Sequence, residues 1–175
     1  MTARAWLSEN DWHLVQKSVP IACADVLPIR DTAKGIEIGL IYRHTPHQGT
    51  RWVTIGGRIL LNEPLHDAVT RQMRETLGGR VHCVVADYPI AVVQYFSRRI
   101  KGHAYDPRQH AIGLTYAVRL SGRIGARGEA LEFRWFSRAE LPSTRHIGFG
   151  QSRMLIDCWT KLEQPFFSAC LPARG

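Results

Sequence analysis

The stretch that decides the fold begins Gly56-Gly57-Arg58-Ile59-Leu60-Leu61-Asn62-Glu63 and continues, seven residues later, with Arg71-Gln72-Met73-Arg74-Glu75-Thr76-Leu77-Gly78. The two leading glycines follow a short strand predicted over 52–55 and allow a ligand to approach the backbone closely. A helix-start signal at 62–64 would place Pro64 at the first helical position. Apolar residues then recur at helical spacing until the glycines at 78–79 end the helix. The stretch therefore predicts a strand, a turn open to a ligand and an amphipathic helix.

Charged residues in the same stretch are spaced so that they can meet. Arg71 and Glu75 lie four residues apart and share a helix face, and Glu63 reaches Arg71 if the loop before the helix folds back. Such a unit can place carboxylates around a hard cation, because Mg²⁺ usually takes one or two protein carboxylates plus phosphate oxygens. The spacing alone favours a plainer alternative, an exposed helix face with one ion pair.

The rest of the chain predicts strands on both sides of this central helix. Apolar and β-branched runs predict strands at 20–29, 36–43, 111–120 and 131–136, with one or two more at 81–95. Ser8 is a candidate N-cap for a short helix over 9–17, and 150–162 is predicted as an amphipathic helix. The pattern predicts a mixed α/β single domain.

The composition is that of an ordinary folded protein. The 175 residues are 45% hydrophobic and 22% charged, which excludes a disordered chain, a collagen-like fibre and a disulfide miniprotein. We find no apolar run long enough to span a bilayer and no secretory signal at the N-terminus. The four cysteines, Cys23, Cys83, Cys158 and Cys170, lack metal-site spacing. We therefore expect a cytoplasmic protein with reduced thiols and no membrane partner.

The charge balance is strongly basic. Lys and Arg number 23 against 15 Asp and Glu, a net charge of +8. The excess is mostly arginine, which binds phosphate through a forked pair of hydrogen bonds, and it is spread along the chain. This distribution favours a small phosphorylated ligand over nucleic acid, with solubility alone as the alternative.

The stretch also resembles the Nudix box. In register with that pattern stand Gly57, Glu63, Arg71, Met73, Glu75 and Gly78, whereas Gln72 and Thr76 replace two expected glutamates and Gly79 an expected apolar residue. The resemblance implies an α/β fold of the Nudix type, an α/β/α sandwich with a central mixed sheet. It covers residues 18–163, with a helical extension at 1–17 and a tail at 164–175.

Within that superfamily the chain is similar to GDP-mannose mannosyl hydrolase-like members. The similarity includes Asp25, the run from Arg43 to Arg58, Gln94 with Phe96, and Arg134-Trp135. It implies a nucleoside diphosphate derivative, such as a nucleoside diphosphate sugar, as substrate, Mg²⁺ or Mn²⁺ as cofactor, and a homodimer. The chain departs from these members at Thr76, Ala111 and Ala130.

Residue by residue, the resemblance and the local chemistry predict four groups. The predicted metal ligands are the Gly56 carbonyl, Glu75 and Glu129. Substrate binding is predicted for Asp25, Arg43 and Arg58, since the arginines can fork onto a diphosphate and a carboxylate in an apolar strand needs a ligand or an arginine partner. The predicted catalytic residues are Glu75, Arg58, His110 and Tyr95, and structural roles in the box are predicted for Gly57, Glu63 and Arg71.

Two functions follow from these residues. The first is a metal-dependent Nudix-type hydrolase of a nucleoside diphosphate derivative, favoured by Glu75 and Glu129. The second is a Nudix-fold binding or regulatory module for a nucleotide-like ligand, favoured by Gln72 and Thr76.

Overall fold

A computed structural model describes residues 7–164. Predictions for residues 1–6 and for 165–175, which include Cys170, lie outside this described range. The other three cysteines are free thiols, as predicted. No helix within 7–164 combines the length and apolar character needed to cross a membrane.

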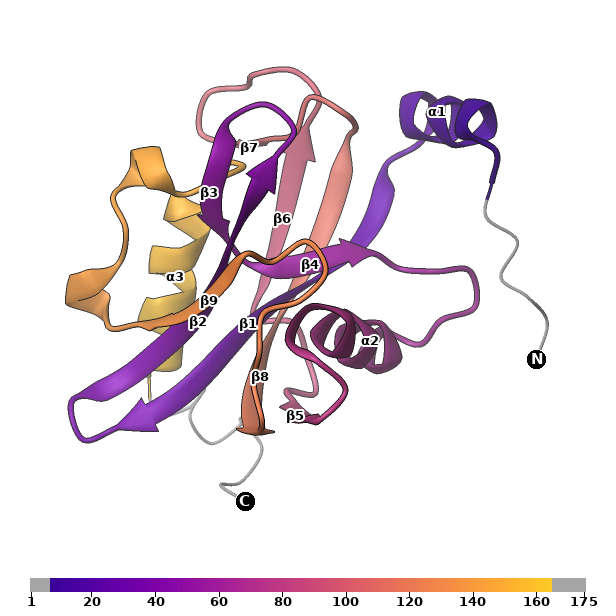
Figure 1. The fold of residues 1–175 in the computed structure, drawn as a ribbon. Helices are drawn as coiled ribbons and strands as arrows, with labels where there is room; N and C mark the ends of the chain where they lie inside the picture. The colour runs from indigo at the N-terminus through magenta and orange to yellow at the C-terminus, as the bar shows by residue number, and fades with distance from the viewer. Residues whose placement is uncertain (1–6, 165–175) are drawn as a thin grey trace.

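Three α-helices accompany a nine-stranded mixed sheet in the described range (Figure 1). The helices are α1 (Glu9–Ser18), α2 (Leu65–Leu77) and α3 (Ser152–Leu162). The strands are β1 (Ile21–Thr32), β2 (Gly35–Thr45), β3 (Gly49–Val53), β4 (Ile55–Arg58), β5 (Val81–Val85), β6 (Ala91–Phe96), β7 (Ala104–Tyr105), β8 (Ala111–Gly122) and β9 (Glu132–Phe136). Two short 3₁₀ turns, Arg138–Glu140 and Thr144–His146, lead into α3.

The parallel pair β1 and β8 forms the centre of the sheet, and each of these strands changes its second partner along its length. The first half of β1 pairs with β4 and its end pairs with β2. Pro28, which has no N–H to donate, lies between these two pairings. In the same way β8 pairs first with β6 and then with β5. At one end of the sheet the central pair is therefore flanked by β4 and β6, and at the other end by β2 and β5. The site lies at the end flanked by β4 and β6.

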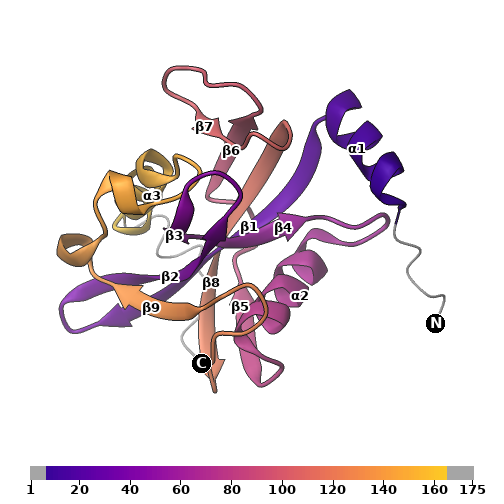
Figure 2. The same ribbon diagram turned by 45° about the horizontal axis from the view of Figure 1, so that its top comes forward.

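Two apolar cores lie on opposite faces of this sheet. Helix α2 buries Ala68, Val69, Met73 and Leu77 on one face, and α3 buries Leu155, Cys158, Trp159 and Leu162 on the other. Figures 1 and 2 show the two helices on either side of the strands. This arrangement is the predicted α/β/α sandwich.

Two local predictions need correction. The glycines Gly56 and Gly57 lie inside strand β4, in register with Asp25 and Ala24, and not in a turn after a strand. Helix α2 begins at Leu65, so Pro64 is its N-cap and not its first helical residue. The helix ends as predicted, with Gly78 at φ 100°, a conformation that glycine tolerates.

The predicted N-terminal helix is present. Ser8 caps α1 by accepting a hydrogen bond from the Asp11 backbone N–H at 3.2 Å. None of its residues is fully buried, but Trp12 and Val15 pack against the α2-side core. Helix α1 contacts the rest of the fold mainly through one face. It lies beside the sheet and does not cover either of the sheet's two faces (Figure 2).

Candidate functional site

A cavity of about 330 Å³ opens where β1, β4, β6 and the 104–111 segment meet. Its walls combine charged, amide and aromatic side chains with the backbone of two glycines. The lining includes Trp12, Gln16, Asp25, Arg43, Gly56, Gly57, Arg58, Tyr95, Asp106, Arg108, Gln109, Glu129, Phe149 and Gln151. It unites Asp25, Arg43, Arg58, Tyr95, Gly56 and Glu129 of the predicted site, and leaves His110 and Glu75 outside.

Asp25 is the most unusual group in this cavity. Strand pairing places it opposite Gly56 on β4 and Thr115 on β8. A Cβ on Gly56, or on Gly113 of β8, would overlap a carboxylate oxygen of Asp25. The side chain is buried, and this burial raises its pKa from 3.8 to about 6, against the lowering effect of a hydrogen bond from Tyr95. A carboxyl group poised near neutral pH in a cavity marks a candidate for proton transfer.

A chain of hydrogen bonds holds this carboxylate. The Tyr95 hydroxyl donates to Asp25 Oδ2 at 3.0 Å and accepts from Gln151 Nε2 at 3.0 Å. The same Nε2 also donates to the Thr54 hydroxyl at 2.9 Å. Burial raises the pKa of Tyr95 well above its usual range, so it stays protonated as a donor. The sequence offered Asp25 and Tyr95 as separate candidates, and the fold makes them one unit.

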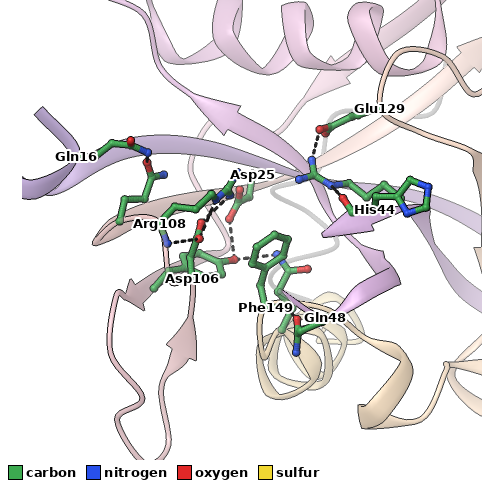
Figure 3. A network of polar contacts seen from close by, with 12 residues as sticks. Gln16, Asp25, His44, Gln48, Asp106, Arg108, Glu129 and Phe149 are labelled. Carbon is green, nitrogen blue, oxygen red and sulfur yellow. Dashed lines mark hydrogen bonds and ion pairs between the residues drawn. The ribbon is translucent and has the colours of Figure 1, made fainter. Parts of the chain in front are cut away.

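Three arginines reach the cavity from different elements. Arg108 forks onto Asp106 with bonds of 2.9 and 2.7 Å, and Arg43 forms an ion pair with Glu129. Arg58 lies over the indole ring of Trp12, with Cζ 4.3 Å from the ring centroid. Figure 3 shows Asp25 between the Asp106–Arg108 pair and Glu129.

Helix α1 supplies lining residues that sequence reasoning did not assign to the site. Trp12 and Gln16 lie one helical turn apart, and the Gln16 amide donates to Gln109 at 2.9 Å. The signal was present as two side chains at i, i+4 spacing, but the resemblance placed residues 1–17 outside the domain. Asp106, Phe149 and Gln151 were also missed, because no local pattern links them to β1.

The box residues outside the cavity form the predicted tie. Arg71 donates to both Glu63 oxygens, at 2.6 and 2.8 Å, and to the Arg58 carbonyl at 3.1 Å. Glu63 in turn accepts from the Leu60 backbone N–H at 2.9 Å. These contacts brace the loop between β4 and α2.

Helix α2 packs a neutral, buried face beneath strand β4. Gln72 lies directly beneath Gly57, where an added Cβ would come within 2.6 Å of the amide nitrogen. One turn later Thr76 is buried, and its carbonyl accepts from the Arg127 N–H of the 123–131 loop. Glu75 points elsewhere: its side chain is 58% exposed and pairs with Arg71 at 3.2 Å.

These donors do not form a metal site. Within residues 7–164 no cluster of three or more His, Cys, Asp or Glu side chains is placed to share an ion. Glu63 is occupied by Arg71 and a backbone N–H, and Glu75 turns outward to Arg71, so no second carboxylate of the box joins Glu129. The residues present therefore do not fit the Mg²⁺ or Mn²⁺ that the resemblance implies.

His110, predicted as a base, lies away from the cavity. Its ring stacks on Phe96 with centroids 4.9 Å apart, and its buried Nε2 has no hydrogen-bond partner within the described residues. The residue is adjacent to Ala111, which does line the cavity.

The sequence matches one known protein family. Residues 2–155 match the family described as Domain of unknown function (DUF4916). The chain belongs to this family. No curated protein matches it in sequence.

Solved structures similar to this DUF4916 member are Nudix proteins. A possible asymmetric diadenosine tetraphosphate hydrolase from Jonesia denitrificans is 26% identical, with a TM-score of 0.72 over 90% of this chain and 99% of that one. The Nudix domain of Shewanella oneidensis NrtR, complexed with ADP-ribose, is 15% identical, with a TM-score of 0.60 over 89% and 99%.

A third structure carries a metal. The bifunctional NMN adenylyltransferase/ADP-ribose pyrophosphatase of Francisella tularensis, complexed with AMP and a Mn ion, is 16% identical, with a TM-score of 0.57 over 93% of this chain and 47% of that one. At these low identities the second and third likenesses show the fold alone. The DUF4916 member therefore has the Nudix fold.

Proposed function

We propose that this protein is a Nudix-type hydrolase that binds a nucleoside diphosphate derivative in the cavity around Asp25. The observation that carries the proposal is the buried Asp25 carboxyl group, which opens into a cavity reached by three arginines. Structurally similar proteins described as nucleotide hydrolases or solved with ADP-ribose support this ligand class. Arginine forks suit the oxygens of a diphosphate, and Trp12 offers an aromatic surface for a base.

The chemistry is assigned to residues of this chain. Above about pH 6 Asp25 is mainly ionised, and it accepts a proton from the attacking water while the Tyr95 hydroxyl holds the carboxylate in place. Arg43, Arg58 and Arg108 stabilise the charge that develops on the departing phosphate group. No step is assigned to a divalent cation, because the donors do not fit one.

The preferred substrate is a nucleoside diphosphate sugar cleaved at the sugar carbon. Water oxygen bonds to the anomeric carbon, the carbon–oxygen bond to the diphosphate breaks, and an intact nucleoside diphosphate leaves with both bonding electrons. Arginine pairing makes that diphosphate a better leaving group. Attack at phosphorus is the competing course, with the same base and the same arginines.

A screen in ¹⁸O-labelled water tests the proposal. Nucleoside diphosphate sugars, ADP-ribose and diadenosine tetraphosphate are incubated with wild type and with Asp25→Asn, and products are read by mass spectrometry. We expect label in the sugar and a loss of roughly 10²–10⁴ in rate for Asp25→Asn. Label in the phosphate product refutes attack at carbon, and equal rates for both proteins refute the role of Asp25.

A binding module without turnover is the second candidate. The neutral face that α2 presents through Gln72 and Thr76 favours it, since the face lacks carboxylates that would activate water. Tight binding of a nucleotide with no product from any substrate in the screen would establish this alternative. The homodimer implied by the resemblance is likewise a proposal, and light scattering on the eluting full-length protein tests it.

A further inference from the structure

We propose that this cavity binds phosphate through arginine without a divalent cation, and that Glu129 is a built-in competitor which the ligand displaces from Arg43. The inference rests on the proposed function, because it specifies how a nucleoside diphosphate is held. It assigns Glu129 a role opposite to the metal ligation that the resemblance implies.

Helix α2 carries no carboxylate on the face that lies under Gly57. Positions 72 and 76 share the face that lies under Gly57 and the 123–131 loop, and both carry neutral side chains that are 8% and 5% exposed. A cation held there would meet an amide and a hydroxyl in place of carboxylates. Glu75 lies one residue away on the helix, and its carboxylate turns outward to Arg71. A divalent ion therefore finds no charged ligand on the inner face of α2.

Glu129 is held in place as the partner of an arginine. Its backbone loop is anchored, because the Ala130 N–H donates to the Arg127 carbonyl and the Leu131 N–H donates to the Tyr42 carbonyl at 2.8 Å. The loop holds Glu129 opposite Arg43, whose side chain is only 13% exposed, while the Glu129 side chain is 45% exposed. Because the Glu129 carboxylate is largely in solvent, its ion pair with Arg43 is weakened by screening. A bidentate phosphate is a stronger partner for the same guanidinium.

Displacement of Glu129 also changes the net charge of the cavity lining. With Glu129 in place, Arg43, Arg58 and Arg108 face the three carboxyl groups Asp25, Asp106 and Glu129, so the lining is close to neutral. Displacement of Glu129 leaves three arginines against two carboxyl groups, both buried. The lining then becomes positive only when an anion takes the place of Glu129. This exchange removes the need for a cation to bring the anion in.

Calorimetric titration with ADP tests the inference, because the two roles of Glu129 predict opposite signs. If Glu129 competes with phosphate, Glu129→Gln binds ADP about two- to fivefold more tightly than wild type. The dissociation constant of wild type should also agree within about twofold in EDTA and in Mg²⁺. The matched control, Glu132→Gln, changes an exposed carboxylate on β9 that does not line the cavity and should leave affinity unchanged.

The opposite results overturn the inference. A Glu129→Gln variant that binds ADP more weakly, or ADP binding that tightens tenfold or more with Mg²⁺, assigns Glu129 to a cation and leaves the proposed function intact. ADP that binds under neither condition overturns the inference and the proposed ligand class together. Titration of the full-length protein with Mn²⁺ in the absence of ADP, followed by electron paramagnetic resonance, gives a separate readout, and we expect no protein-bound Mn²⁺.

Discussion

Replacing Asp25 by asparagine should stabilise this protein at neutral pH while removing its activity. The carboxyl group is buried, and its pKa in the folded state is about 6 against 3.8 for the ordinary group. The native state therefore binds the proton more tightly than the unfolded chain. The protonated carboxyl group contributes to the free energy of unfolding. This contribution is fully present below about pH 4 and is lost as the pH rises through about 6. Asparagine keeps an acceptor for the Tyr95 hydroxyl and never ionises.

The magnitude follows from the shift. About 2 pKa units correspond to about 3 kcal/mol of unfolding free energy. The advantage of Asp25→Asn over wild type should grow by about 2 kcal/mol between about pH 4.5 and pH 8, because part of the effect already lies below that range. Urea unfolding of both proteins across this range measures it. Other titrating groups are shared, so their contributions cancel in the difference.

A surface substitution provides the control. Asp157→Asn removes an exposed carboxylate on α3 that pairs with Arg153 at 3.5 Å, and its effect should stay within a few tenths of a kcal/mol at every pH. A flat profile for Asp25→Asn, or a variant less stable than wild type at pH 8, would refute the reasoning. A variant that unfolds with a higher free energy but turns over substrate more slowly would indicate that Asp25 serves function and destabilises the folded state.

Three further substitutions test the surroundings of the site. Arg71→Ala leaves the Glu63 carboxylate, whose side chain is 8% exposed, buried without its main partner, so we expect a loss of about 3–5 kcal/mol in urea unfolding, and a loss below 1 kcal/mol would contradict it. Gly56→Ala drives a methyl group into the Asp25 carboxylate and should cost about 1–3 kcal/mol, measured by thermal unfolding; an equal cost in an Asp25→Ala background would argue against this clash. Arg58→Lys keeps the charge but loses the fork, so the dissociation constant for ADP should rise about tenfold by calorimetry, and unchanged affinity would place the phosphates elsewhere.

Much of the scaffold was readable from the chain because it depends on local patterns. The 3.6-residue period of the apolar positions in α2, the glycine that ends it and the Ser8 cap of α1 are all interactions between near neighbours. The tie between Glu63 and Arg71 was also accessible, since the box spacing brings them together across one short loop. Some errors concerned boundaries, as with Pro64, where one residue decides between cap and helix. Others concerned elements: the short strand β7 was not predicted, and the predicted strand at 52–55 is divided between β3 and β4.

The composition of the site was only partly readable. Asp25, Arg43, Arg58 and Tyr95 were named as separate candidates, but whether they meet depends on strand register. A shift of one residue in β1 would turn Asp25 to the opposite face, and a shift in the segment before β8 would exchange His110 for Ala111. Successive side chains of a strand alternate between the two faces of the sheet. Which face a residue occupies is therefore not predictable from its own strand alone and depends on pairing with the neighbouring strand.

The sequence by itself determined the mixed α/β class, the central helix and a basic, arginine-rich chain suited to an anionic ligand, because these follow from residue types and short spacings. Only the tertiary structure decided that Trp12 of α1 forms a wall of the cavity and that Asp25 is buried beside Tyr95. It also decided that Glu129 faces an arginine. The contacts of Asp25 with Tyr95 and of Arg43 with Glu129 join residues 70 or more positions apart. Their energies come from burial and charge pairing after the sheet has formed, so no local pattern in the chain encodes them.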